Sequence, residues 1–404
     1  MTVSSQSQRQ TQLAIMRRFA AYIRDGGSDL ADAPMVNDVS VYTDPARHAA
    51  ERQKLFRETP LVAALSSEIA PGAFRTFDAT GVPVVVARDG GGAIRAFLNI
   101  CPHRGARLVR QEEGRANRFT CWFHGWTYGA DGRLIAAPEA DRFCGGMAGR
   151  DHLVALPCEE RHGLVFVIAT PGLAMDLDAH LGSFAAVLGA MGLDSAERVK
   201  SGELPVAANW KYALDTYGEG YHFAALHKQT LAPFFRNDIT IYDRFDRCHR
   251  VSWAQKDWDS WASKPECEWP VRAEPAGVHY LYPNTILFCG SVSPGKSYLT
   301  VFRHFPGEEV GSTVTHKAIY AFGGVKSPEH RAEVEAAFDA TAHVVKSEDY
   351  VTAAEGWKNM CALPPGSTVV YGRQEMALQN VHRALADGCG MALPGPAGVR
   401  EAAR

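Results

Sequence analysis

The stretch from Cys101 to His124 constrains this chain more than any other part of the sequence. It holds a Cys-x-His pair, Cys101 and His103, and a Cys-x-x-His pair, Cys121 and His124. Two thiolates and two imidazoles in two close pairs form a set of metal ligands, but zinc fingers group like residues together, and here each pair is mixed. A cluster of two irons and two sulfides, with both cysteines on one iron and both histidines on the other, needs mixed pairs because each loop then gives one ligand to each iron. The pattern therefore predicts such a cluster, with a structural zinc site as the alternative.

The residues around these ligands resemble the Rieske iron–sulfur proteins. They read Cys-Pro-His-Arg-Gly (101–105) and His-Gly-Trp-x-Tyr (124–128), the form seen in Rieske oxygenases and their ferredoxins. The Rieske proteins of respiratory cytochrome bc complexes have an extra cysteine in each loop, and Ala106 and Phe123 stand at those positions here. A ferredoxin needs only the region around the loops, whereas 404 residues are enough for two domains and a substantial core.

Composition excludes several classes of partner. The formal net charge of −3 gives no reason to expect binding to nucleic acid or to an anionic membrane. No apolar run is long enough to span a membrane, no secretory signal opens the sequence, and the other cysteines lack paired spacing, so we expect a cytoplasmic protein with reduced thiols. The Arg-rich start could belong to a mitochondrial transit peptide, but an apolar stripe that includes Met16, Phe19 and Ala20 favours a surface helix.

The chain is expected to be an α+β protein with two main domains. Short β-rich segments separated by turns, such as 74–78, 82–88 and the Asp89-Gly90-Gly91-Gly92 turn, predict a small antiparallel-β domain over residues 41–168. Aromatic-rich strands followed by long helical patterns over 328–357 and 373–386 predict a second domain over 169–404 with a large antiparallel sheet. Residues 1–40 are expected to contribute a helix that packs on this second domain.

A second metal site is predicted from His222 and His227. The pattern of this segment predicts a helix, and a step of five residues turns two side chains roughly 140° apart around a helix axis. Both imidazoles can bind one ion only if the helix is widened locally, as in a π-turn, or ends there. Two imidazoles and one carboxylate on one face of an iron form the facial triad of non-haem iron oxygenases. A pair of histidines without a metal, or a zinc site with hydrolytic chemistry, are the alternatives.

A wider resemblance covers residues 40 to 390. Asn209-Trp210-Lys211, Gly218 to His222 and His227 resemble the catalytic signature of the large (α) subunit of Rieske non-haem iron aromatic ring-hydroxylating oxygenases. The resemblance implies a Rieske [2Fe-2S] domain followed by a helix-grip-like catalytic domain, with one cluster and one mononuclear Fe(II) per subunit. It implies Asp349 as the third iron ligand, with Glu348 as the alternative.

The same resemblance gives Glu219 a catalytic role. A carboxylate at this place connects an iron-ligand histidine to a cluster histidine of the neighbouring subunit, so Glu219 is expected to link His222 to His124 of another chain. Electron transfer needs short gaps, so this expectation implies a head-to-tail homotrimer, with or without a small β subunit.

The expected function is the oxygenase component of a multicomponent system that activates O₂ and dihydroxylates an aromatic substrate. Monooxygenation or oxidative demethylation is the alternative, and an electron carrier without oxygenase activity is an alternative of another class. No nucleotide-binding fingerprint is present, so a separate NAD(P)H-dependent reductase is expected, with or without a ferredoxin. A pocket for a small aromatic or apolar substrate is expected from residues that core packing explains equally well: Leu214, Tyr217, Phe223, Leu226, Phe288 and Phe302.

Overall fold

The computed structural model describes residues 3–143, 146, 148–269, 277–293 and 295–395. The chain divides into two compact units. The loop unit comprises Arg52–His180 and Leu193–Ser195 and contains both Cys/His loops. The sheet unit comprises Met1–Glu51, Leu181–Gly192 and Ala196–Arg404.

These units differ from the expected domains at both boundaries. Residues 41–51, expected in the first domain, belong to the sheet unit because the Tyr42 hydroxyl donates to Asp215 and Glu51 accepts a hydrogen bond from the Trp210 indole at 2.9 Å. Residues 169–180, expected in the second domain, belong to the loop unit, where Arg161 pairs with Asp178 at 2.7 Å.

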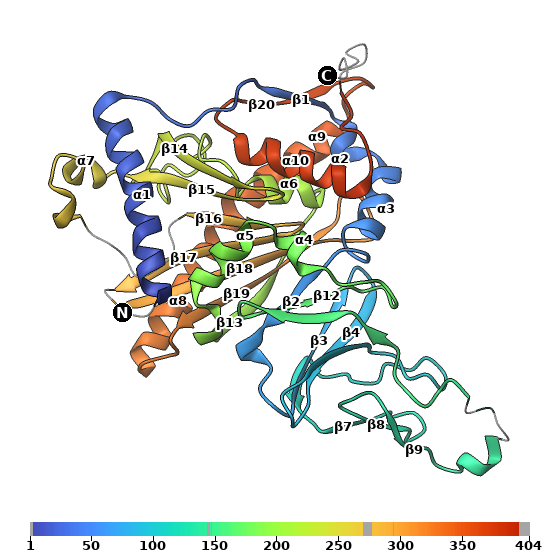
Figure 1. Cartoon of the computed structure of the whole chain (residues 1–404). Coiled ribbons are helices and arrows are strands. Elements are labelled where there is room, and N and C mark those ends of the chain that lie inside the picture. The colour runs from blue at the N-terminus through green and yellow to red at the C-terminus, as the bar shows by residue number, and fades with distance from the viewer. Residues whose placement is uncertain (1–2, 144–145, 147, 270–276, 294, 396–404) are drawn as a thin grey trace. The chain divides into compact units, whose positions relative to one another are not determined.

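The loop unit is an assembly of three antiparallel sheets (Figure 1). The glycine-rich segment forms a turn as predicted, because the Asp89 side chain accepts hydrogen bonds from the backbone of Gly91 and Ala93. The sheets have the strand orders β10-β5-β4-β3-β6, β11-β12-β2 and β7-β8-β9. The strands are β2 (Leu61–Leu65), β3 (Ala73–Ala79), β4 (Val82–Arg88), β5 (Ile94–Leu98), β6 (Glu113–Arg115), β7 (Arg118–Thr120), β8 (Thr127–Gly129), β9 (Leu134–Ala136), β10 (Ala155–Leu156), β11 (Cys158–Arg161) and β12 (Leu164–Val167).

The sheet unit is built on a seven-stranded antiparallel sheet of order β13-β19-β18-β17-β16-β15-β14. A short pair, β1 (Met35–Asp38) with β20 (Thr368–Tyr371), lies apart from it. The seven strands are β13 (Ala196–Val206), β14 (Phe235–Phe245), β15 (Cys248–Gln255), β16 (Val278–Leu281), β17 (Thr285–Ser293), β18 (Lys296–Pro306) and β19 (Thr313–Phe322).

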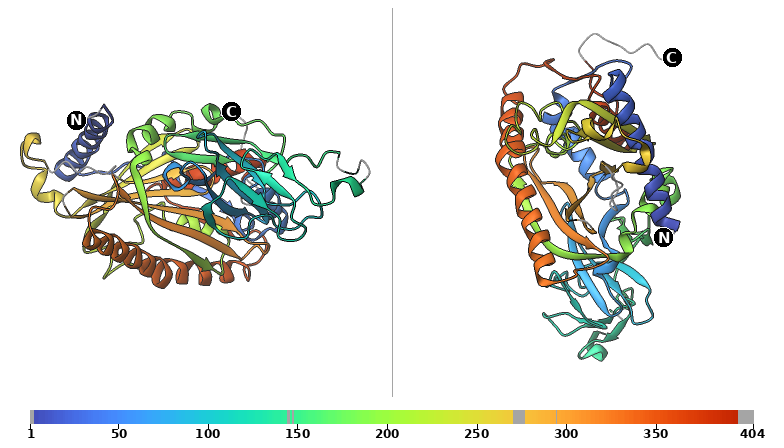
Figure 2. Two further views of the ribbon diagram at one scale, coloured as in Figure 1. Left: turned by 90° about the horizontal axis from the view of Figure 1, so that it is seen from below. Right: turned by 90° about the vertical axis from the view of Figure 1, so that its left-hand side faces the viewer.

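One long helical segment runs along a face of this sheet (Figure 2). The helical pattern predicted over 328–357 is confirmed as α8 (Pro328–Val344) and α9 (Tyr350–Met360), joined by a π-helical turn, η5 (Val345–Asp349). Ser327 caps α8 by accepting a hydrogen bond from the backbone of His330, and Pro328 occupies the first turn, where its missing N–H costs nothing.

Further helices complete the sheet unit. The N-terminal helix α1 (Val3–Asp25) buries Ile15, Met16 and Phe19 against the side chains of Ile239 and Trp258. The other helices are α2 (Ser40–Thr43), α3 (Pro45–Lys54), α4 (Leu177–Leu181), α5 (Phe184–Met191), α6 (Trp210–Asp215), α7 (Trp258–Trp261) and α10 (Met376–Cys389), with α3 and α4 each crossing a boundary between the units.

The expected α+β class is confirmed: a small antiparallel-β unit and a large antiparallel sheet covered by helices. Among the described residues, no helix is both long and apolar enough to cross a membrane.

Candidate metal centres

The two Cys/His loops have the same backbone hydrogen bonds. In the first loop the Cys101 N–H donates to the Ala106 carbonyl at 2.8 Å, and the Gly105 N–H donates to the Cys101 carbonyl at 3.0 Å. In the second loop Cys121, Trp126 and Gly125 make the equivalent bonds at 2.7 and 2.9 Å. Gly105 and Gly125 both have φ of +74°, a conformation that residues with a side chain rarely adopt. Each loop is thus a tight turn that begins at a cysteine and closes at a glycine.

These turns bring the four predicted ligands together inside the loop unit. Cys101 and Cys121 are buried free thiols in one apolar cluster, and the rings of His103 and His124 lie 4.6 Å apart. Burial raises the pKa of Cys101, so the buried thiol needs a metal to become a stable thiolate. Burial and neighbouring His124 lower the pKa of His103, which keeps that imidazole neutral, as a metal ligand must be. Two thiols and two imidazoles placed in this way fit a [2Fe-2S] cluster.

Aromatic side chains surround the ligands on two sides. Trp126 is buried and stacks flat on His103, with ring centroids 4.6 Å apart. Trp122 and Phe123, by contrast, lie on the surface with 63% and 46% of their areas exposed. Trp126 therefore fixes the orientation of a ligand, whereas the exposed pair offers an apolar contact surface beside the second loop.

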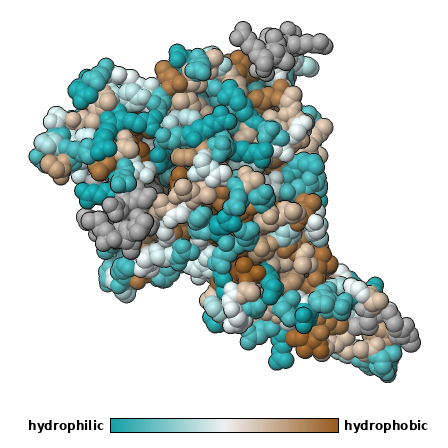
Figure 3. Space-filling model, viewed as in Figure 1, coloured by the Kyte–Doolittle hydropathy of each residue, from teal (hydrophilic) through white to brown (hydrophobic). Residues whose placement is uncertain are grey.

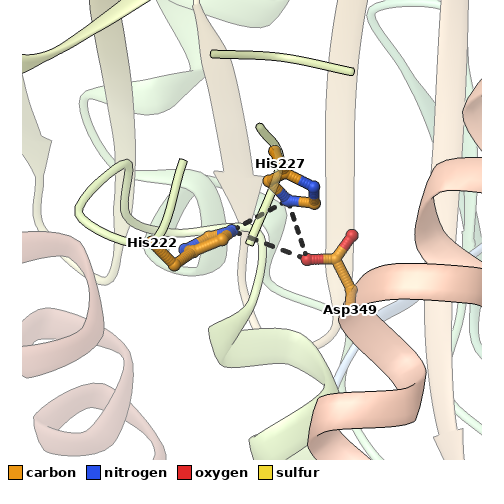
Figure 4. A group of neighbouring side chains, drawn as sticks. All are labelled: His222, His227 and Asp349. Carbon is orange, nitrogen blue, oxygen red and sulfur yellow. Dashed lines mark hydrogen bonds and ion pairs between the residues drawn. The ribbon is translucent and has the colours of Figure 1, made fainter. Parts of the chain in front are cut away.

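The sheet unit contains a second group of candidate ligands. His222, His227 and Asp349 point toward one another, the histidines from one loop and the aspartate from the long helical segment (Figure 4). The two Nε2 atoms are 3.1 Å apart, and Oδ1 of Asp349 lies 3.5 Å from the first and 3.2 Å from the second. Ligand atoms about 2.1 Å from one ion and at right angles to each other lie about 3.0 Å apart, so this triangle matches a single ion with three neighbouring ligands.

The atoms of this triangle lack other partners. Oδ1 of Asp349 is buried and, apart from the two imidazole nitrogens of the triangle, has no hydrogen-bonding partner among the described residues. A buried carboxylate oxygen left in this way is destabilising unless a cation binds it. The donor set, two imidazoles and one carboxylate, is the one that suits non-haem iron(II) and leaves adjacent positions open. His222, His227 and Asp349 therefore fit a mononuclear iron.

Two further carboxylates orient the histidines. Nδ1 of His222 bonds to Glu219, which also accepts from the backbone N–H of His222 at 3.1 Å. Nδ1 of His227 lies 2.5 Å from Oε2 of Glu348, and Thr230 donates to the same oxygen. Because a carboxylate only accepts, each Nδ1 carries the proton and each Nε2 presents its lone pair to the metal position. The structure thus places Asp349 in the triangle and Glu348 behind His227.

The histidine segment departs from a regular helix, as a shared metal site requires. The His222 carbonyl accepts from the Leu226 N–H and the Phe223 carbonyl from the His227 N–H, which makes a single helical turn that ends at His227. We predicted that the helix either widens locally in a π-turn or ends at this segment. The structure shows that it ends here, and the π-turn occurs instead in η5, which ends at Asp349. Gly220 permits the turn, since a Cβ there would lie 2.6 Å from the Trp253 indole.

Nearby carboxylates raise the pKa values of His222 and His227. Burial lowers the pKa of His222, but the carboxylates of Asp349 and Glu219 outweigh burial and raise that pKa to about 9. The same balance of burial against Asp349 and Glu348 raises the pKa of His227. Iron must therefore displace protons as it binds, and its binding strengthens as the pH rises.

The predicted pocket residues fall into separate groups. Phe223 lies beside both histidines, 5.2 Å from the His222 ring and 5.8 Å from the His227 ring. Tyr217 packs on Phe302 at 4.9 Å. Leu214 is buried in α6, Leu226 is half-buried in the histidine loop, and Phe288 contacts Tyr298 at 6.4 Å.

Sequence reasoning missed a buried polar group beside Tyr217. The Tyr217 hydroxyl lies 3.3 Å from the Tyr350 hydroxyl, which lies 2.6 Å from Oγ1 of Thr315. Tyr217 also contacts the His304 ring at 4.9 Å. The sequence offered one signal for this group, since Tyr350 directly follows Asp349.

Comparison with known proteins identifies the family. A family model described as the Rieske [2Fe-2S] domain matches residues 59–157, and one described as the ring hydroxylating alpha subunit (catalytic domain) matches residues 193–390. The chain is a Rieske oxygenase of the α-subunit family. Each subunit accordingly carries one Rieske cluster and one mononuclear iron.

Relatives of this Rieske oxygenase include monooxygenases and dioxygenases. It is 29% identical over 274 residues to the carnitine monooxygenase oxygenase subunit of Escherichia coli (strain K12), an alignment that covers 66% of this chain and 69% of that one. It is 28% identical over 232 residues to the 2-halobenzoate 1,2-dioxygenase large subunit of Burkholderia cepacia, covering 54% and 48%. The quaternary ammonium Rieske monooxygenase CntA, solved with L-carnitine, shares the fold with a TM-score of 0.72 and 21% identity over 92% of this chain and 98% of that one.

Proposed function

We propose that this Rieske oxygenase is a monooxygenase that hydroxylates a carbon bonded to the nitrogen of a small quaternary ammonium compound. The observation that carries the proposal is the triangle of His222, His227 and Asp349, with edges of 3.1 to 3.5 Å, in a chain that also holds a Rieske domain. In this proposal these three residues bind the iron, and Cys101, His103, Cys121 and His124 bind the cluster.

The reaction has a simple balance. One O₂, two electrons and two protons convert the C–H bond to C–OH and release one water. The hydroxylated carbon then loses the nitrogen, giving a tertiary amine, a carbonyl compound and a proton; a hydroxylated methyl group gives formaldehyde. The iron supplies O₂ activation, and the protein positions the C–H bond, excludes water and fixes the two imidazoles through Glu219 and Glu348.

Two features favour a cationic substrate. Sequence similarity to the carnitine monooxygenase subunit extends over 66% of the chain. Phe223 stands beside both histidines and 5.1 Å from the Trp253 ring, and aromatic faces attract quaternary ammonium groups.

Dihydroxylation of an aromatic substrate is the second candidate. The similarity to a halobenzoate dioxygenase subunit favours it, as does the apolar pair Tyr217 and Phe302, which suits a flat ring.

The two electrons that the reaction consumes must come from other proteins. We propose a separate NAD(P)H-dependent reductase, with or without a ferredoxin, and a head-to-tail trimer in which Glu219 links His222 to His124 of the next chain. Exposed Trp122, Phe123 and Ile135 support a protein contact beside the cluster, and Figure 3 shows a hydrophobic patch over the region of β8 and β9. A molar mass three times that of the chain in solution would support the trimer, and a monomer active at all concentrations would overturn it.

Product analysis tests the proposal. The holoenzyme is incubated with a reductase, NADH and either γ-butyrobetaine, glycine betaine or 2-chlorobenzoate. We expect a tertiary amine with a carbonyl product, or formaldehyde, from an ammonium compound. A cis-diol from the benzoate, or the catechol that such a diol gives by loss of chloride and CO₂, would establish dihydroxylation instead. Product formation that survives His222→Ala would show that the sheet unit is not the oxygenating site.

A further inference from the structure

The three ligands of the iron triangle are not held in the same way. Carboxylates orient both histidines, since Glu219 bonds to Nδ1 of His222 and Glu348 to Nδ1 of His227. By contrast, no described residue outside the triangle bonds to the carboxylate of Asp349. The position of this carboxylate therefore depends on what holds the helical segment around it, where the π-turn η5 leads into α9.

The residue that follows Asp349 anchors this part of the helical segment. Tyr350 is buried, and its hydroxyl lies 2.6 Å from Oγ1 of Thr315 in β19. The same hydroxyl lies 3.3 Å from that of Tyr217, in the stretch that connects α6 to the histidine loop. One buried hydroxyl thus joins the helix that carries Asp349, the stretch that leads to the two histidines, and the central sheet.

The partners of Tyr350 are themselves fixed on the sheet. The Tyr217 ring packs on the rings of Phe302 and His304, in each case with centroids 4.9 Å apart. His304 lies directly opposite Thr315 in the pairing of β18 with β19, and both side chains are fully buried. A hydrogen bond shielded from water in this way is costly to break, because its partner is left unsatisfied. The Tyr350 hydroxyl is therefore tied to two immobile groups.

We propose that Tyr350 is a positioning residue for the mononuclear iron. Through its hydroxyl it holds the Asp349 carboxylate at the distance from the two imidazoles that a single ion requires. The inference rests on the iron site of the proposed function, and it adds to that site a residue that does not touch the metal. Residues that orient metal ligands typically change metal affinity ten- to a hundredfold when they are removed. A tyrosine that only fills space would leave the binding of iron unchanged.

Iron release tests this inference without a substrate. The holoenzyme is mixed with excess iron(II) chelator in the absence of air, and loss of the mononuclear iron is followed over time. We expect Tyr350→Phe, which keeps the ring and removes the hydroxyl, to release iron about tenfold faster than the wild type. The electron paramagnetic resonance signal of nitric oxide added as a probe of this iron should change, because it reports ligand geometry. The Rieske signal should stay the same.

Tyr280→Phe is the matched control. Tyr280 is a fully buried tyrosine of the same sheet, and its hydroxyl donates to the Pro283 carbonyl at 2.7 Å. This variant also loses one buried hydrogen bond, but that bond does not reach the helix or the histidine loop, so iron release and the nitric oxide signal should match the wild type. The inference is overturned if Tyr350→Phe releases iron no faster than Tyr280→Phe.

Thr315→Val provides a second test, which holds even if Tyr350→Phe does not fold. Valine has nearly the shape of threonine, so this variant removes only the other end of the bond, and it should also release iron faster than the wild type. In the double variant the two effects should not add, because both changes break the same contact. Release at the wild-type rate in Thr315→Val, or additive effects, would overturn the inference. Failure of the proposed iron site is read separately, as an Asp349→Ala variant that keeps its mononuclear iron.

Discussion

The two metal centres of this Rieske oxygenase are built in opposite ways. The cluster ligands lie within 24 consecutive residues, in two turns whose backbone hydrogen bonds are the same. The mononuclear site joins a loop at His222 and His227 to a helix residue, Asp349, more than a hundred positions later. Local turns determine the first geometry, whereas the second depends on the whole sheet unit and on carboxylates that orient its histidines.

The largest expected effect comes from removing a ligand of the mononuclear iron, which should leave the cluster in place. Asp349→Ala removes a ligand, so the protein should lose its mononuclear iron and keep the two cluster irons and the Rieske spectrum. Oxygenation should fall on the order of a thousandfold or more, because O₂ activation requires the metal. Iron analysis, electron paramagnetic resonance and product formation measure these three quantities. Loss of the Rieske spectrum in this variant would mean that the centres do not assemble independently.

Acid should destabilise the sheet unit through its buried histidines. Burial lowers the pKa values of His249, His279 and His304 to about 3, whereas unfolded histidine has a pKa near 6.5. The unfolded chain therefore binds up to three more protons between these values, so stability present above pH 6.5 is lost as the pH falls toward 3. The free energy of unfolding therefore falls by about 1.4 kcal/mol per pH unit for each histidine. For all three histidines the slope is about 4 kcal/mol per pH unit.

Denaturation at several pH values measures this slope, and His279→Gln should reduce it by about one proton. An unchanged slope in that variant would contradict the assignment of a neutral buried histidine.

The two orienting carboxylates should differ in their effects. Glu348→Gln leaves a weaker acceptor behind His227, so iron affinity should fall about tenfold. Glu219→Gln should retain iron, but it should slow oxidation of the reduced cluster during a single turnover about a hundredfold if Glu219 also connects neighbouring subunits. Equal effects of the two variants on cluster oxidation would remove the reason to assign Glu219 a role between chains.

The smallest expected effect is on stability, when the glycine that closes either cluster turn is replaced. Alanine at Gly105 or Gly125 must adopt φ of +74°, which costs about 1 kcal/mol. A Cβ at Gly125 would also lie 3.2 Å from Cγ of Pro138, whereas at Gly105 nothing lies within 4 Å. Gly125→Ala should therefore lower the free energy of unfolding more than Gly105→Ala. Denaturation followed by cluster absorbance gives both values, and the reverse order would show that the turns are not equivalent.

Sequence spacing was enough for the cluster but not for the mononuclear site. Cys101, His103, Cys121 and His124 could be predicted because turns of four or five residues bring them together by local geometry alone. Glu348 and Asp349 are adjacent in the sequence and chemically alike, so only the path of the helix distinguishes the one in the triangle from the one behind His227.

The remaining differences have tertiary causes. Residues 41–51 precede the first strand of the loop unit, yet Tyr42 and Glu51 pack on residues of the sheet unit, which no local pattern indicates. Lys317 follows an alternating strand pattern, and nothing in that pattern shows that a helix covers its side chain.

The π-turn at Val345–Asp349 determines the direction in which Asp349 points. Such a turn contains one residue more than the α-helix it interrupts, so deleting Ser347 would restore regular hydrogen bonding and carry Asp349 about 100° around the axis relative to α8. The shortened helix would gain regularity while its carboxylate turned away from the imidazoles. The extra residue therefore serves the position of the metal ligand at the expense of a regular helix.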